Sequence, residues 1–186
     1  PIIWHSPDPR FVLPPAEVHI SGTMKKILKK KRFALTIDRQ FEDVIHACAT
    51  TRRPRQNGTW ITDDMEEAYI ELHRLGWAHS IEAHLEGTDG PLAGGFYGVS
   101  IGAMFFGESM FSKEPDASKA VFIPFAMTLA SLGFRLIDSQ VYTDHVSSLG
   151  GREMARADYL TLLAEAVAMP GRKGSWTDLE QVASSV

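Results

Sequence analysis

Two acids and an amide lie in otherwise apolar sequence, where they could take part in proton transfer. Glu108 lies in FFGESMFS (105–112), a predicted strand rich in Phe and Met. A carboxylate in such a strand must be paired, hydrogen-bonded or solvated in a cleft. Glu108 is therefore either the floor of a functional site, where burial and partners set its pKa, or a surface acid at a strand end.

The amide and the second acid lie in LIDSQ (136–140), also a predicted strand. Asp138 and Gln140 are two residues apart, so strand alternation places both side chains on one face. A carboxylate next to a carboxamide offers a charged acceptor and a group that both donates and accepts. Such a pair could fix and deprotonate an amine nucleophile. The alternative is a polar strand end that bonds a neighbouring loop.

Basic residues are concentrated in two segments that contain no acids. The first is the predicted helix 21–32, with Lys25, Lys26, Lys29, Lys30, Lys31 and Arg32; the second is the loop 51–58, with Arg52, Arg53 and Arg55. These clusters indicate either a solvated face or a polyanion partner. The net charge of −4 over the whole chain argues against nucleic acid, so the local pattern disagrees with the total. Trp60, just after the second cluster, could stack on a base or belong to the core.

The remaining reactive side chains exclude several kinds of site. Cys48 is the single cysteine, so neither a disulfide within the chain nor a cysteine-based zinc site can form; we expect it to be buried. His73, His79 and His84 lack the spacing of a helical zinc motif. His145 follows the Asp138 strand and could orient the site or cap the next helix.

Length and composition indicate an ordinary globular protein. The 186 residues are 44% hydrophobic and 23% charged, no apolar run reaches the ~18 residues that span a membrane, and no signal peptide is visible. These features favour the cytoplasm. We expect residues 1–20, with five prolines, to be an extended surface arm that remains from a missing N-terminal domain. A catalytic domain over 21–168 and a peripheral tail over 169–186 would follow.

The order of predicted elements indicates an α+β fold with a mixed, mostly antiparallel sheet flanked by helices. Helices are predicted at 21–32, 39–50, 62–75, from about 117 to Gly133, and at 156–167; strands are predicted at 33–38, 77–86, 92–102, 103–111 and 134–141. This order is compatible with the N-acetyltransferase fold. The connection SMFSKEPDASKA (109–120) lacks the G-x-G that lets backbone amides approach a pyrophosphate, which disfavours acetyl-CoA.

Eight segments, in this order, resemble the bacterial leucyl/phenylalanyl-tRNA–protein transferases over residues 2–167. They are WHSPDPR (4–10), GTWIT (58–62), AHSIE (78–82), GGFYGV (94–99), FFGESMFS, DASK (116–119), LIDSQ and HVSSLGGRE (145–153). The resemblance implies an N-acetyltransferase-like enzyme that uses no metal or free CoA. It implies transfer of Leu or Phe from Leu-tRNA or Phe-tRNA to acceptor proteins with N-terminal Arg or Lys, which marks them for degradation, without a membrane partner.

The resemblance also implies roles for individual residues. Asp138 and Gln140 match the pair that handles the acceptor's α-amino group, and Glu108 matches a carboxylate suited to a cationic terminus; which carboxylate is the base stays open. A pocket for the transferred side chain is implied at Phe96, Phe105, Met110 and Phe125. Trp60 matches an aromatic beside the terminal adenosine, and the helix of Lys25–Lys31 and Arg32 matches basic residues that grip tRNA.

The chain departs from the family pattern at its start and at two single positions. The family's N-terminal segment, with a Gly-Gly-Asp-Leu stretch and a Phe-Pro-Trp motif, is absent, and His5 and Ser139 replace an aromatic and a frequent Cys. Two alternatives to the transferase therefore remain. One is a non-catalytic tRNA- or RNA-binding remnant, and the other is a small-molecule acyltransferase.

Overall fold

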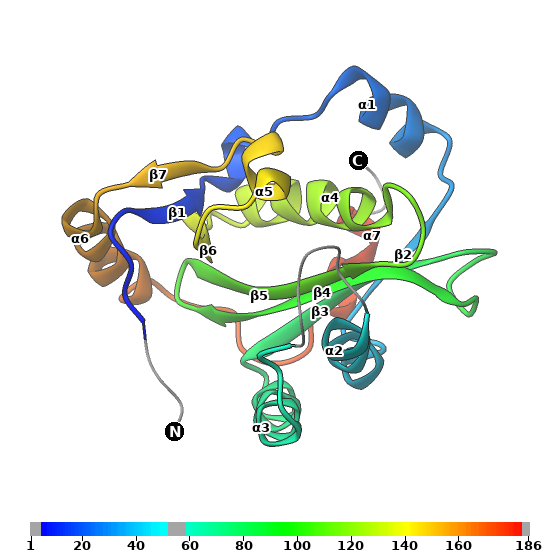
Figure 1. The fold of residues 1–186 in the computed structure, drawn as a ribbon, viewed down its shortest axis with the longest axis horizontal. Helices are drawn as coiled ribbons and strands as arrows, with labels where there is room; N and C mark the ends of the chain where they lie inside the picture. Colours follow the sequence, from blue (N-terminus) through cyan, green and yellow to red (C-terminus); the bar gives the residue numbers. More distant parts are fainter. Residues whose placement is uncertain (1–4, 52–58, 184–186) are drawn as a thin grey trace.

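The computed structural model describes residues 5–51 and 59–183, which form one seven-stranded sheet with helices on both faces (Figure 1). The strands are β1 (Arg10–Leu13), β2 (Ala34–Ile37), β3 (Ala78–His84), β4 (Leu92–Ile101), β5 (Met104–Ser112), β6 (Leu136–Gln140) and β7 (Arg152–Met154). Their order is β2-β3-β4-β5-β6-β1-β7. Only the β5–β6 pair is parallel in this described sheet. The predicted mixed, mostly antiparallel α+β fold is confirmed.

The helices predicted at 21–32, 39–50, 62–75, 117–133 and 156–167 are present with small changes in their bounds, as α1 (Gly22–Lys29), α2 (Phe41–Thr50), α3 (Asp63–Arg74), α4 (Ala117–Ser131) and α6 (Arg156–Val167). Two short helices are added to them, α5 (Asp144–Ser148) and, within the predicted tail, α7 (Glu180–Ala183). Single-turn 3₁₀ helices lie at Pro15–Glu17 and Thr177–Leu179. Among the described residues, no helix is long and apolar enough to cross a membrane.

Helix α4 covers one face of the sheet, and α2 and α3 cover the other (Figure 1). Packing follows from the sequence pattern: Met24 of α1 and Phe41 and Cys48 of α2 are buried, as their helical spacing predicts. Helix α1 begins where expected, because the Ser21 hydroxyl accepts a hydrogen bond from the Met24 amide at 3.2 Å. Cys48 is a free, buried thiol, as expected.

The prediction of a surface arm over residues 1–20 is wrong for β1. Residues Arg10–Leu13 form an internal strand that pairs with β6 on one side and β7 on the other. Phe11, Val12 and Leu13 are at most 3% exposed. The prolines suggest an extended arm, but Pro9 and Pro14 lie on either side of the segment RFVL and not within it. RFVL contains no proline, so each of its residues has the backbone N–H that pairing in a sheet requires.

The prediction of a peripheral tail over 169–186 is also wrong for the described part of that segment. Trp176 is 0% exposed and stacks on His79 with a 3.8 Å centroid separation. Its backbone N–H donates to Asp38 at 2.8 Å, and its indole donates to the Arg172 carbonyl at 3.1 Å. The core therefore extends beyond 21–168 at both ends. The tail lacks helical or strand periodicity, which is the signal that burial usually leaves in a sequence.

We expect Trp176→Ala to lower the free energy of unfolding by about 3–5 kcal/mol, because it removes a fully buried indole and its hydrogen bond to the Arg172 carbonyl. Urea denaturation followed by circular dichroism measures the loss. Met169→Ala, at a side chain that is 40% exposed in the same segment, is the matched control and should change stability by less than about 0.5 kcal/mol. Equal losses for the two variants would contradict a structural role for Trp176.

Candidate active site

Strands β5 and β6 run side by side for three residue pairs and then separate. Their parallel register joins Met104 to Leu136, Phe105 to Ile137, and Phe106 to Asp138. Beyond this point β5 continues alongside β4 to Ser112, whereas β6 ends beside β1. Glu108 and Gln140 both lie just past the separation, so the topology brings the predicted chemical residues to one place in the sheet.

A bulge in β5 determines where Glu108 lies. Ser109 pairs with Tyr97 and Gly107 pairs with Gly98, so Glu108 is an extra residue between two consecutive partners on β4. A bulged residue leaves the ladder and turns its side chain away from the regular alternation. The side chain is half-buried, and its neighbour is the hydroxyl of Tyr69 from α3, with which it forms a hydrogen bond.

Burial raises the pKa of Glu108 to about 7. The negative charge of Asp138 acts in the same direction, whereas the Tyr69 hydrogen bond and the positive charge of Arg10 act against the rise. An ordinary surface acid at a strand end is therefore not the correct interpretation of Glu108. At neutral pH this carboxyl group exchanges a proton readily, which is the property that a general base or acid needs.

Asp138 is 0% exposed and receives four hydrogen bonds. Arg10 donates through Nε to Oδ1 at 2.9 Å and through Nη2 to Oδ2 at 2.7 Å. The backbone N–H of Gln140 donates to Oδ1 at 2.9 Å, and the Tyr159 hydroxyl donates to Oδ2 at 2.6 Å. A carboxylate has about four lone-pair positions, so these donors occupy its acceptor capacity.

Gln140 ends β6 in the left-handed region, with φ of 59°. Non-glycine residues seldom adopt this conformation, and it ends the strand alternation that the sequence suggested for Asp138 and Gln140. The hydrogen bonds between the two residues therefore run through the backbone. The Asp138 carboxylate accepts from the Gln140 N–H, and the Gln140 side-chain amide donates to the Asp138 carbonyl at 3.2 Å.

Trp60 lies on the same face of the sheet as Glu108. Its ring packs edge-on against Tyr69 at 6.4 Å between centroids, and Tyr69 in turn contacts Tyr97 at 5.2 Å. Trp60 is 43% exposed, so it is not a core residue. An exposed indole beside the tyrosine that contacts Glu108 can stack on a ring of a bound substrate.

The four residues predicted to line a side-chain pocket do lie together, but three of them are closed in the core. Phe125 contacts Phe96 at 5.1 Å and Phe105 at 4.9 Å between ring centroids, and each of the three is at most 2% exposed. Met110 packs against this cluster and is half-buried. The rings occupy the α4 face, opposite the face of Tyr69 and Tyr159, and Trp176 fills the space beside them.

Comparison with known proteins shows the family of this chain. The sequence model of the leucyl/phenylalanyl-tRNA protein transferases matches residues 12–164, which include Glu108, Asp138, Gln140 and Tyr159. The chain belongs to this family. The leucyl/phenylalanyl-tRNA–protein transferase of Syntrophus aciditrophicus is 50% identical over 186 residues, 100% of this chain and 77% of the relative. That of Myxococcus xanthus is 48% identical over 178 residues, 96% of this chain and 75% of the relative.

The family resemblance implies that the lysine-rich helix α1 grips tRNA, and in the structure the charges of this helix are accessible to solvent. The basic side chains of the segment are all exposed: Lys25, Lys26, Lys29, Lys30, Lys31 and Arg32. Arg32 is partly neutralised, because it pairs with Glu114 at 2.7 Å. Helix α1 lies outside α4 (Figure 1). The second cluster, Arg52, Arg53 and Arg55, lies outside the described residues.

His145 does not cap the helix that contains it. Thr143 caps α5 by accepting the Val146 N–H at 3.2 Å, and His145 is the second residue of this five-residue helix. Burial, and secondarily the charge of Lys119, lowers the pKa of the His145 imidazole, so neutral pH leaves it uncharged. Among residues 5–51 and 59–183, no group of three or more His, Cys, Asp or Glu side chains could hold a metal ion.

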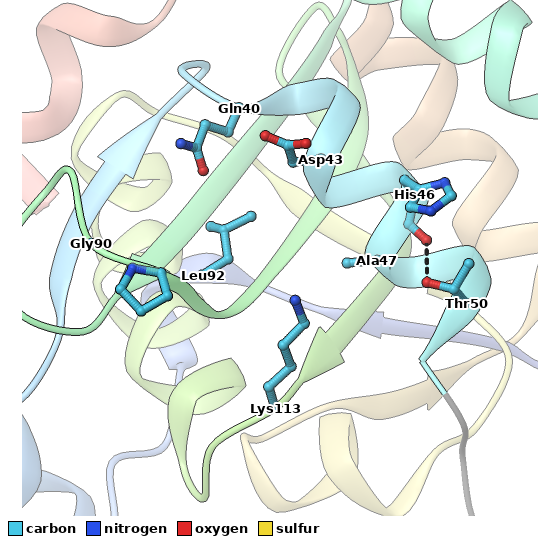
Figure 2. A pocket seen from close by; sticks show the side chains of 9 residues that line it. Gln40, Asp43, His46, Ala47, Thr50, Gly90, Leu92 and Lys113 are labelled. Atoms are coloured by element: carbon cyan, nitrogen blue, oxygen red, sulfur yellow. Dashed lines mark hydrogen bonds between the residues drawn. The ribbon is translucent and has the colours of Figure 1, made fainter.

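A groove that the sequence did not reveal lies along α2 (Figure 2). It has a volume of about 350 Å³, and its polar lining includes Gln40, Asp43, His46, Thr50 and Lys113. Figure 2 shows Lys113 reaching toward α2 from the end of β5, and it marks the bond from the Thr50 hydroxyl to the His46 carbonyl. None of these residues belongs to the Glu108 and Asp138 networks, so the groove is separate from the candidate active site.

Proposed function

We propose that this chain transfers leucine or phenylalanine from aminoacyl-tRNA to the α-amino group of an N-terminal Arg or Lys, and so marks the acceptor protein for degradation. Two observations together support this proposal: the chain belongs to the transferase family, and Glu108 has the position and the pKa of a catalytic carboxyl group. Its carboxyl group has a pKa near neutrality, and Glu108, like Gln140, lies just past the point where β5 and β6 separate. A buried carboxyl group with a pKa near neutrality favours the transferase over a binding remnant.

The reaction forms one C–N bond and breaks one C–O bond. The acceptor nitrogen attacks the ester carbonyl of the aminoacyl-tRNA, and the terminal ribose hydroxyl of the tRNA leaves with the electron pair of the C–O bond. Before attack the α-ammonium must lose a proton, and we assign that proton to Glu108. A second proton passes from nitrogen to the leaving oxygen, and Glu108 later releases its proton to water.

Matched pKa values favour Glu108 for this role. A protein α-ammonium has a pKa of roughly 7.7–8.0, and the Glu108 pKa of about 7 lies close to it. Proton transfer between them is therefore nearly balanced, whereas an ordinary glutamate near 4.3 would be ~3.5 units too acidic. The ester is already activated, so holding amine and ester together supplies much of the remaining rate.

Other side chains support the binding of the two substrates. The Gln140 amide, which like Glu108 belongs to a residue just past the strand separation, is suited to orient the acceptor amine. Trp60 is suited to stack on the terminal adenine, because its exposed ring lies on the Glu108 face. We assign the transferred side chain to the half-buried Met110 end of the phenylalanine cluster; because this cluster lies on the α4 face, the side chain would enter it from the Glu108 face through the separation of β5 and β6.

The direct experiment measures transfer of labelled phenylalanine from Phe-tRNA to a peptide with N-terminal Arg. Labelled peptide is the expected product, and the same peptide with an acetylated N-terminus is the matched control because it has no free amine. Transfer to neither peptide, under conditions where the protein binds Phe-tRNA, would contradict the proposed function and favour the remnant. Equal labelling of both peptides would mean that phenylalanine is attached to a group other than the α-amine.

We expect the α1 lysines to contribute the salt-dependent part of tRNA binding. Replacing Lys25, Lys26, Lys29 and Lys30 by Glu should weaken binding and flatten the plot of log affinity against log salt, by roughly 0.7–0.9 per lost phosphate contact. Filter binding between 50 and 200 mM salt is the measurement. Arg135→Glu, at another exposed cation, is the control, and an unchanged slope in the lysine variant would mean that the helix is only a solvated face.

A further inference from the structure

We propose that Arg10 and Tyr159 are positioning residues that hold Gln140 in its working conformation through Asp138. The inference rests on the proposed function for its kinetic consequences, although its structural content can be measured without any transfer. It assigns Asp138 to the support of the site and leaves Glu108 to accept the proton.

Asp138 has no capacity left to act as a base. Its two oxygens receive four donors at 2.6–2.9 Å, and the side chain is 0% exposed. A proton arriving from a substrate would have to displace the guanidinium, the phenol or the backbone amide. A substrate amine would also have to reach a carboxylate that has no exposed surface.

The donors to Asp138 fix the orientation of its carboxylate. The guanidinium of Arg10 grips both oxygens, which sets the plane of the carboxylate as well as its position. Tyr159 of α6 holds Oδ2 from a second direction, and the Arg10 guanidinium lies 5.1 Å from the centre of the Tyr159 ring. Strand β1, helix α6 and strand β6 thus meet at one buried group.

The fixed carboxylate of Asp138 in turn holds the backbone of Gln140. The Gln140 backbone has a φ of 59°, and its N–H is held by Asp138 Oδ1 at 2.9 Å. A side-chain carboxylate that accepts the N–H two residues later stabilises a local turn. The turn sets the direction in which the Gln140 side chain leaves β6. Loosening the carboxylate should therefore release Gln140, even though Arg10 and Tyr159 do not contact a substrate in this assignment.

Two conservative substitutions test the assignment in the whole chain. Tyr159→Phe removes one hydroxyl, and Arg10→Lys keeps the charge but removes the two-point grip. We expect the maximal transfer rate to fall about tenfold for Tyr159→Phe and on the order of 100-fold for Arg10→Lys. The KM for Phe-tRNA should be unchanged in both. Tyr142→Phe, which removes the hydroxyl of a tyrosine that is 57% exposed, is the matched control.

A double-mutant cycle shows whether these residues act through Gln140. In a Gln140→Ala background, Tyr159→Phe should cost little further rate, because the side chain that it positions is already gone. If Tyr159→Phe slows transfer by the same factor in both backgrounds, the proposal is overturned. This comparison has meaning only where the unmodified chain transfers phenylalanine, so it is separate from a failure of the proposed function.

Hydrogen exchange tests the same inference without catalysis. We expect the Gln140 backbone amide to be protected in the unmodified protein and to exchange about tenfold faster or more in Tyr159→Phe and Arg10→Lys. Amides of β3 and β4 should keep their protection, which verifies that both variants remain folded. Unchanged exchange at Gln140 in both variants would overturn the proposal, whatever the transfer assay shows.

Discussion

Glu108→Gln lowers the single-turnover rate of aminoacyl transfer at pH 7 by about 10²–10⁴-fold, the usual contribution of a general base. The amide cannot accept the proton of the α-ammonium, whereas it keeps the size of the side chain and a hydrogen-bonding contact for Tyr69. Rapid mixing of Phe-tRNA-loaded protein with saturating Arg-peptide measures the rate of the chemical step without product release.

The control for this prediction is the same Glu→Gln change at a surface position. Glu165 is exposed on α6, and Glu165→Gln should leave the rate within about twofold, since surface substitutions rarely alter a site. The affinity for Phe-tRNA should be the same in both variants. A loss confined to Phe-tRNA affinity in Glu108→Gln would mean that the carboxylate binds the donor and does not take a proton.

Asp138→Ala should destabilise the fold by about 3–5 kcal/mol, the cost of leaving a buried guanidinium without its partner. The Arg10 side chain is only 12% exposed, so water cannot replace the lost carboxylate. The Tyr159 hydroxyl loses its acceptor in the same variant. Urea denaturation gives the change in free energy of unfolding, and Asp158→Ala, at an exposed acid on α6, is the control and should be near neutral.

A second variant separates the stability of this network from its role in transfer. Replacing both charges, as in Arg10→Met with Asp138→Leu, should recover much of the lost stability, because no unpaired ion remains in the interior. The double variant should not recover transfer, because no carboxylate then accepts the hydrogen bond from the Gln140 backbone N–H. If Asp138→Ala were no less stable than Asp158→Ala, the network would contribute nothing to the fold, and its assignment as a support would be wrong.

The central polar residues can be predicted from the sequence because they interrupt apolar strands. Glu108, Asp138 and Gln140 stand out for this reason, and the topology does bring them to one strand separation. What strand periodicity cannot show is the β5 bulge at Glu108 or the left-handed turn at Gln140. Both depart from the regular alternation on which such predictions depend.

The partners of these residues cannot be recognised from their local sequence patterns. Arg10 lies between prolines that suggest an extended arm, and Tyr69 and Tyr159 lie in helices where a partly buried aromatic side chain is common. A signal is present for Arg10, since RFVL between Pro9 and Pro14 has the length and composition of a strand. The family resemblance points to the phenylalanine cluster, but it does not reveal that Trp176 closes the cluster from the C-terminal side.

The pH dependence of the ratio between the unmodified and Glu108→Gln rates tests the central claim most directly. Single-turnover transfer to an Arg-peptide would be measured for both proteins from pH 6 to 9. Suppose that Glu108, with its pKa of about 7, takes the ammonium proton. The transfer rate of the unmodified protein then levels off near pH 7, whereas the transfer rate of the variant keeps rising with pH until the free amine forms near pH ~8. The ratio should then be greatest at or below pH 7 and fall about tenfold by pH ~8. A ratio that stays constant from pH 6 to 9 would contradict proton transfer to Glu108.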